Sequence, residues 1–247
     1  MELQQGNICV GRRNGNKYPS KKGYTRIVVL MPSSPYGGKK WVPLSPYYLK
    51  DDKGALVENI WQFSKYYRSV PHSHQMYSRF SKKVIWEHPS EVHETNGYPN
   101  QAYLAWREKG IQNTDAVRYP VGYNHRGECV SAYKEHDDGF VDLDTPLDYV
   151  TARKEIYLPV YTKAVKKHPL FDALKEKLKN GENLLIIEVD GPHQESLSYY
   201  KELYGVGDDF IEDDSILVTK ENMDIMLNDP KHNFGHGYCL AMALLDL

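Results

Sequence analysis

The sequence of 247 residues predicts one mainly α-helical domain with a few short strands. Two amphipathic stretches, at residues 57–67 and 148–178, repeat apolar side chains at helical spacing. A nearly uninterrupted apolar run at residues 239–245 predicts a buried terminal helix. Only two short runs rich in β-branched residues, 27–30 and 184–189, predict strands. Helices therefore dominate the predicted fold.

The first 25 residues are polar and basic, and they predict a loosely held arm in front of a domain at residues 26–247. Their lysines and arginines lie among glycines and asparagines, so contact with a phosphate is the alternative to a solvated terminus. The strand that follows, over residues 24–31, ends at Pro32. A turn-rich loop is expected at residues 33–38.

Prolines interrupt residues 68–147, so this third of the chain is expected to hold no long helix. A short helix is predicted at residues 98–109, ended by Gly110. His72 and His74 are followed by no carboxylate at the spacing of metal ligands. No metal site is therefore expected there.

Helical periodicity is regular again at residues 148–165, where Pro159 is expected to kink or split the helix. Pro169 opens a second predicted helix at residues 170–178. The Asn-Gly pair at residues 180–181 is the predicted stop of that helix.

Composition restricts the class of protein. The hydrophobic content of 40% suffices for a folded core, and 31 basic against 33 acidic residues argue against a protein that coats polyanions. No run is long and apolar enough to span a bilayer, and the N-terminus lacks the layout of a signal peptide. Cys9, Cys129 and Cys239 form no Cys-x-x-Cys pair. We therefore expect a cytoplasmic protein without a metal, a cofactor, disulfides or a membrane partner.

The stretch at residues 57–67 places three polar side chains on one narrow helical stripe. Glu58, Gln62 and Lys65 provide a carboxylate, an amide and an ammonium group in a row. Apolar and aromatic side chains, Trp61 among them, occupy the opposite side. A stripe of this kind can also simply face water, in which case Glu58 and Lys65 are ordinary surface charges.

The order of these residues resembles the signature helix of the NADAR family, the YbiA-like proteins. That helix has roughly the pattern Ser/Thr-Glu-His-x-x-Gln-x-x-Lys-Phe. Val57 and Asn59 depart from the pattern, because they replace the Ser/Thr and the His. The residues that keep their places are Glu58, Gln62, Lys65 and the aromatic Tyr66.

Other segments resemble the same family in the same order along the chain. Leu-Ser-Pro-Tyr at residues 44–47 is similar to a Phe-Ser-Asn-Phe-like segment that precedes the family helix. Asn233 and Gly237 are similar to the Asn-x-x-Gly of its closing segment, although Leu227 stands where the family has a tryptophan. The family proteins are shorter in the middle, which implies an insertion at about residues 68–147.

The resemblance implies cleavage of an N-glycosidic bond. Some members hydrolyse a phosphoribosyl-aminopyrimidine intermediate of riboflavin synthesis, and others remove ADP-ribose from guanine bases of nucleic acid. A carboxylate near the anomeric carbon can stabilise the positive charge that develops there, or accept a proton from the attacking water. Glu58 is implied for this role, with Asp224 as a second carboxylate. The implied substrate-binding residues are Ser45, Tyr47, Gln62, Lys65, Tyr149, Asn233 and Gly237.

Two other functions fit the sequence as well. One is a non-catalytic protein that binds ADP-ribose or a related nucleotide, because Val57, Asn59, Tyr149 and Leu227 all depart from the family pattern. The other is a different nucleotide- or DNA-modifying enzyme on the same scaffold, with residues 68–147 building its pocket. In each case the expected partner is a nucleotide or an ADP-ribosyl small molecule, or nucleic acid that carries a modified base.

Overall fold

The chain, described by a computed structural model, divides into two compact units. Unit 1 consists of Met1–Ser45 and Tyr161–Leu247, and unit 2 consists of Pro46–Val160. These boundaries differ from the expected arm at residues 1–25 and the expected insertion at residues 68–147. The residues that the structure describes are 5–15, 17–30, 40–78 and 80–247.

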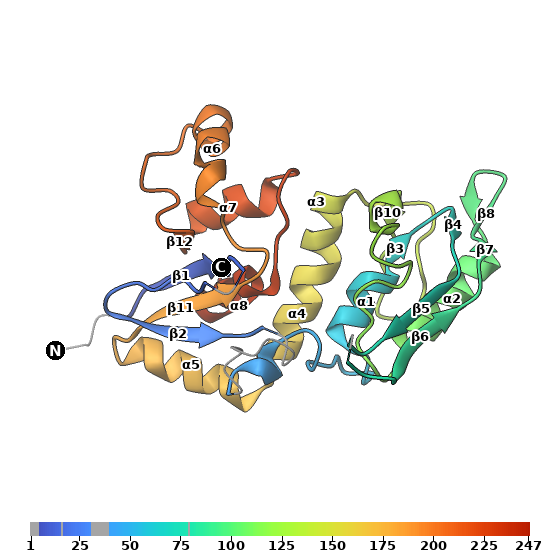
Figure 1. The fold of residues 1–247 in the computed structure, drawn as a ribbon, viewed down its shortest axis with the longest axis horizontal. Helices are drawn as coiled ribbons and strands as arrows, with labels where there is room; N and C mark the ends of the chain where they lie inside the picture. Colours follow the sequence, from blue (N-terminus) through green and yellow to red (C-terminus); the bar gives the residue numbers. More distant parts are fainter. Residues whose placement is uncertain (1–4, 16, 31–39, 79) are drawn as a thin grey trace. The chain divides into compact units, whose positions relative to one another are not determined.

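Unit 1 is built around a mixed sheet (Figure 1). Its four strands are β1 (Ile8–Arg12), β2 (Tyr24–Val28), β11 (Asn183–Glu188) and β12 (Ser215–Leu217). They lie in the order β12-β1-β11-β2, with β11 parallel to both β1 and β2 and with β12 antiparallel to β1. Every side chain of β11 from Leu184 to Glu188 is buried, as is usual for a parallel strand that is covered on both faces.

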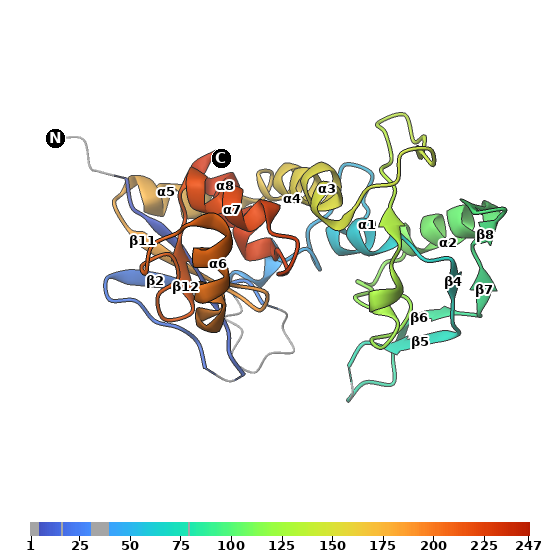
Figure 2. The same ribbon diagram turned by 90° about the horizontal axis from the view of Figure 1, so that it is seen from above.

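The helices of unit 1 are α4 (Leu158–Val165), α5 (Pro169–Lys179), α6 (Leu197–Tyr204), α7 (Lys220–Asn228) and α8 (His236–Leu245), with the 3-10 helices η1 (Val42–Leu44) and η4 (Gln194–Ser196). The boundary between the units falls inside α4. α8 packs against β1 and β11, and α5 contacts both β11 and α8, beside which it lies in Figure 2. All residues of α8 from His236 to Leu244 are buried, so this helix forms the centre of the core.

Unit 2 combines short helices with two-stranded antiparallel sheets, among them β5 with β6 (Figure 2). Its helices are α1 (Val57–Phe63), α2 (Gln101–Ile111), α3 (Tyr149–Ala152), the 3-10 helix η2 (Arg126–Glu128) and the π-helix η3 (Arg153–Tyr157). Its strands are β3 (Lys65–Tyr66), β4 (Ser69–Val70), β5 (Ser73–Met76), β6 (Val84–His88), β7 (Glu91–Val92), β8 (Glu94–Thr95), β9 (Tyr98–Pro99) and β10 (Ser131–Ala132). Within the described residues of both units, no helix has the length and apolar character needed to cross a bilayer.

The core of unit 2 is largely aromatic and joins α1 to α2. The ring centroid of Phe63 lies 4.8 Å from that of Trp86 and 4.7 Å from that of Trp106. Gly110 of α2 lies directly against this ring, because a Cβ atom built there would be 2.0 Å from Cδ1 of Phe63. Gly110 was expected to end the helix, but α2 continues to Ile111. The glycine is present because it leaves room for the phenylalanine ring.

We expect Gly110→Ala to lower the free energy of unfolding by about 1–3 kcal/mol, because the added methyl group overlaps the Phe63 ring and forces the core to shift. The higher helix propensity of alanine raises the free energy of unfolding by about 1 kcal/mol. The sign of the measured change shows whether this gain or the overlap with Phe63 is larger. Gly127→Ala is the matched control, since nothing lies within 4 Å of a Cβ atom at that position. Urea unfolding that gives the two variants equal stability would contradict this packing argument.

The prediction of a mainly α-helical fold is wrong, because the structure is α+β, with a mixed four-stranded sheet and several small sheets. β1 lies inside the segment expected to be a loose arm, and its Ile8, Cys9 and Val10 are fully buried between β11 and β12. Three apolar residues among polar ones give no clear period, so the strand is specified by its distant partners. The loop expected at residues 33–38 lies outside the described residues.

Other predicted elements are confirmed. The two predicted strands correspond to β2 and β11, and the apolar end of the chain corresponds to α8. α5 begins at Pro169 and ends at the C-cap residue Asn180, which is followed by Gly181 with a φ of 81°. The expected break near Pro159 is the π-helical turn η3, which ends two residues before this proline.

Candidate active site

The polar stripe that begins on α1 is a series of hydrogen bonds. Nε2 of Gln62 donates to Oε1 of Glu58 over 2.9 Å, and Nζ of Lys65 donates to Oε1 of Gln62 over 2.8 Å. Residues four and three positions apart face one another on a helix, and this spacing produces the contacts even though α1 ends two residues before Lys65. Glu58 is only 5% exposed, so it is not an ordinary surface charge.

Aromatic rings and a second cation adjoin this series. Nζ of Lys65 lies 4.9 Å from the ring centroid of Trp61. The Trp61 ring lies 5.0 Å from that of Tyr157 and 6.3 Å from that of Tyr149. The guanidinium of Arg153 is fully buried, 5.1 Å from the Tyr149 ring. Unit 2 therefore gathers a carboxylate, an amide, two cations and three aromatic rings.

The segment before α1 is tied to Glu58 through the backbone. The N–H of Glu58 donates to the carbonyl oxygen of Pro46 over 3.0 Å. Tyr47 follows directly and is partly exposed. Ser45 is fully buried, and its N–H donates to the carbonyl oxygen of Val42 over 2.9 Å. Of the predicted pair, Tyr47 can thus reach a ligand, whereas Ser45 has the environment of a core residue.

Asn59, which replaces the histidine of the family pattern, anchors a loop of unit 2. Its Nδ2 donates to the carbonyl oxygens of Asn113 and Asp115 over 2.9 and 3.0 Å. Its Oδ1 accepts from the N–H of Val117 over 2.8 Å, and the side chain is fully buried. A neutral imidazole offers one donor and one acceptor only, so it could not make all three bonds. The departure from the pattern therefore has a structural reason.

Asn59→Ala is expected to lower the free energy of unfolding by about 2–4 kcal/mol, because it leaves buried backbone groups without partners. Asn222→Ala is the control, since that amide makes one exposed bond, to the carbonyl oxygen of Leu217 over 2.9 Å. Its loss should cost about 1 kcal/mol or less. Denaturant unfolding gives the free energy of unfolding of both variants. Equal losses in the two variants would contradict a stabilising role for the loop contacts of Asn59.

The residues predicted near the end of the chain lie in unit 1, and two of them are exposed. Asp224 is on α7, where its side chain is 53% exposed and pairs with Lys220 one turn earlier. Asn233 donates from Nδ2 to Oδ1 of Asp190 over 3.1 Å. Asp224 thus has the environment of a surface charge, which gives no support to a catalytic role.

Gly237 contacts a carboxylate of its own chain rather than being left open for a phosphate. Its N–H donates to Oε2 of Glu188 over 2.7 Å, and Nδ1 of His236 lies 2.9 Å from the same oxygen. A Cβ atom at Gly235 would lie 2.5 Å from Cδ of Glu188, and one at Gly237 would lie 2.9 Å from its Cβ. These glycines are therefore needed for the close approach of the chain to Glu188.

Glu188 is a buried anion to which sequence reasoning assigns no role. Burial by itself raises the pKa of this carboxyl, but His236 and the N–H groups of Gly237 and Val189 outweigh it and lower the pKa to about 2. Arg153 is a second such residue. In the sequence, Glu188 and Arg153 could have been found as charged residues at positions that the surrounding apolar pattern predicts to be buried.

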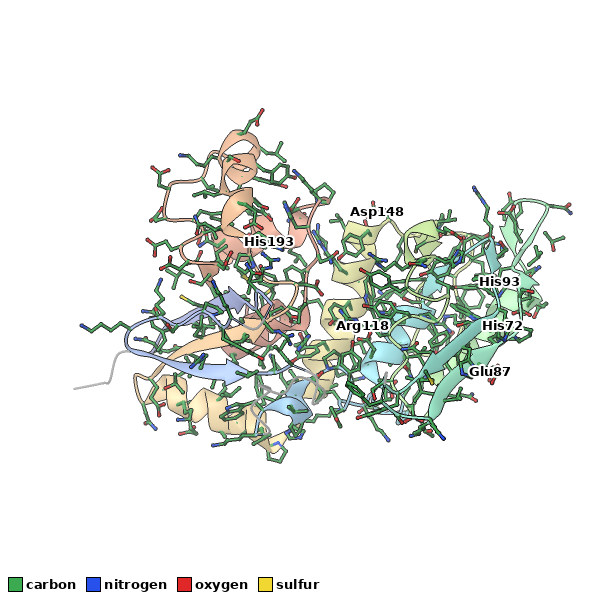
Figure 3. The ribbon with its side chains drawn as sticks, viewed as in Figure 1. His72, Glu87, His93, Arg118, Asp148 and His193 are labelled. Atoms are coloured by element: carbon green, nitrogen blue, oxygen red, sulfur yellow. The ribbon has the colours of Figure 1, made fainter. Side chains whose placement is uncertain are left out.

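His72 and His74 lie close to Glu87 of strand β6, and Figure 3 labels His72 and Glu87. Nε2 of His72 is 3.8 Å from the Glu87 carboxylate, and Nδ1 of His74 is 3.6 Å from it. The sheet thus supplies the carboxylate that the sequence spacing lacks. Within the described ranges, however, no group of three or more side chains is placed to hold a metal ion.

A polar hollow of about 380 Å³ lies in unit 1, and no predicted site residue lines it. Three carboxylates and one ammonium group face it, and Nζ of Lys21 is already 3.3 Å from Oε2 of Glu212. A diphosphate would be repelled there, so we do not place a nucleotide in this hollow. It is lined by Ser20, Lys21, Gln194, Asp208, Ile211, Glu212, Asp213 and Ser215.

Comparison with known proteins finds no relative of this chain. No family model matches the chain, and neither a curated protein nor a solved structure matches it. The resemblance to the NADAR family therefore depends on the sequence motifs alone.

Proposed function

We propose that this protein is an N-glycosidase that hydrolyses the bond between a ribose moiety and a nitrogenous base. The observation that carries the proposal is the buried carboxylate of Glu58, which is held by Gln62 and through it by Lys65. A carboxylate fixed in this way needs little rearrangement to stabilise a developing positive charge. The resemblance suggests ADP-ribosylated guanine or a phosphoribosyl-aminopyrimidine as the substrate.

In the proposed reaction the bond between the anomeric carbon and the base nitrogen breaks, and its electron pair goes to the base. Positive charge then develops on the sugar ring, next to the carboxylate of Glu58. A water oxygen bonds to the anomeric carbon, and Glu58 accepts one proton of that water. A proton from solvent completes the base, and Glu58 returns the proton of the water to solvent, so the products are the free sugar moiety and the free base.

The neighbouring side chains have distinct roles in this proposal. Gln62 positions the carboxylate, and the ammonium group of Lys65 offers charge to a phosphate of the substrate. The rings of Trp61 and Tyr149 offer faces for a base or a sugar, and Tyr149 is 39% exposed. Asp224 is left out because it is exposed and paired with Lys220.

The test uses the full chain with two substrates, oligonucleotides that carry ADP-ribosylated guanine and a phosphoribosyl-aminopyrimidine. Chromatography follows the release of the sugar moiety over time. Release from either substrate is the expected result. If neither is cleaved but calorimetry detects ADP-ribose binding, the protein is a nucleotide-binding protein instead. Absence of both release and binding would contradict the assignment altogether.

A further inference from the structure

Three side chains of unit 1, none with a role in the proposed glycosidase, form a hydrogen-bonded series. Oγ of Ser196 lies 3.0 Å from Nε2 of His232, and Nδ1 of His232 lies 2.6 Å from Oδ2 of Asp229. The order hydroxyl, imidazole, carboxylate is that of a serine activated by a histidine base. The serine and the histidine are 36 positions apart, so the tertiary fold assembles the series.

Asp229 favours one tautomer of the His232 imidazole. It is fully buried and accepts hydrogen bonds from the hydroxyls of Tyr199 and Tyr200 over 2.8 and 2.6 Å. Burial acts to raise the pKa of Asp229, but these and other donors hold it below its ordinary value. An ionised carboxylate can only accept, so in the neutral imidazole of His232 it favours the tautomer with the proton on Nδ1. Nε2 therefore presents its lone pair to Ser196.

Tyr200 supports the same arrangement. Its hydroxyl oxygen lies 3.0 Å from Nδ1 of His232, and its hydrogen goes to Asp229. The oxygen is then a second acceptor that faces Nδ1. Both neighbours of Nδ1 thus favour the tautomer that a general base at Nε2 requires.

Ser196 occupies the N-cap position of α6 but does not cap the helix. A serine there usually accepts a hydrogen bond from the first turn, whereas this side chain makes no such bond. Its hydroxyl instead contacts His232, whose side chain is 20% exposed, while that of Asp229 is 1% exposed. The base is therefore accessible and the carboxylate is not. Figure 3 labels His193, the residue directly before the 3-10 helix η4, which ends at Ser196.

We propose that Ser196 is the nucleophile of an acyl-transfer site that cleaves small carboxylic esters, with His232 as its general base and Asp229 as a positioning residue. Oγ of Ser196 bonds to the ester carbonyl carbon as its proton moves to Nε2 of His232. The bond from that carbon to the alcohol oxygen then breaks, and the alcohol leaves with the proton. Water repeats both steps on the acyl-serine, which releases the carboxylic acid and restores Ser196.

The test treats the full chain with a fluorophosphonate, which forms a stable bond to activated serines. Peptide mass spectrometry then locates the adduct. We expect the adduct on Ser196, whereas Ser198, an exposed serine two positions further along α6, stays unmodified. In His232→Gln the adduct should form at least about 100-fold more slowly, because general-base assistance contributes about 10²–10⁴-fold.

Ser198→Ala is the matched control, and it should be labelled at the wild-type rate. Circular dichroism establishes that each variant is folded. Lack of an adduct on Ser196 in the wild-type protein overturns the proposal without any variant being needed. An unchanged rate in folded His232→Gln also overturns it, since Ser196 would then react without the base.

Discussion

Glu58→Gln is expected to slow the release of ADP-ribose by about 10³-fold or more, because it removes the negative charge and the proton acceptor at once. The amide has the size of the carboxylate, and its oxygen can still accept the hydrogen bond from Gln62. Binding of ADP-ribose is therefore expected to persist, and the fold to be retained. Single-turnover release and calorimetry measure the two effects separately.

The chain contains a closely matched control for this substitution. At the C-terminal end of α2, Nε2 of the C-cap residue Gln112 donates to Oε1 of Glu108 over 3.1 Å, and the two residues have the same spacing as Glu58 and Gln62. Glu108 is exposed, so Glu108→Gln makes the same chemical change in a comparable pair on the surface. We expect wild-type release from this variant. Equal slowing by both substitutions would mean that the effect is not specific to Glu58.

Stability is expected to fall steeply in acid because of Glu188. Its pKa is about 2 in the folded protein, below the ordinary value of 4.5, so folding favours the ionised form. The stabilisation is fully present above about pH 4.5 and is lost as the pH falls through about 2. A shift of this size corresponds to about 3 kcal/mol.

Glu188→Gln should remove this part of the pH dependence, because an amide does not titrate. Glu176→Gln is the control, since Glu176 pairs with Lys179 on the surface over 2.9 Å. Urea unfolding between pH 2 and pH 5 compares the slopes, and only Glu188→Gln should be flatter than wild type. Parallel slopes for Glu188→Gln and wild type would rule out Glu188 as the source of the acid sensitivity.

Features that depend on neighbouring residues could be predicted from the sequence. The spacing of Glu58, Gln62 and Lys65 led to a row of polar groups, and the structure joins them by hydrogen bonds. Even here the helix was expected to reach residue 67, but Lys65 and Tyr66 instead form β3, which pairs with β10. Strand pairing with a distant segment thus overrides local helical periodicity.

Features assembled from distant segments could not be predicted. β1 becomes a strand because it pairs with β11, more than 170 positions later in the chain, and the short apolar run Ile8–Val10 does not reveal this. The series of Ser196, His232 and Asp229 likewise depends on how α6 and the segment after α7 meet. Asp224, assigned by resemblance alone, is on the surface instead.

The central claim is that a carboxylate at position 58 enables the cleavage, and chemical rescue tests it most directly. Single-turnover release from ADP-ribosylated guanine is measured for Glu58→Ala with and without sodium formate, a small carboxylate that can enter the space left by the side chain. We predict no detectable release without formate and a partial recovery that rises with its concentration. Release at the wild-type rate by Glu58→Ala, unaffected by formate, would contradict the claim.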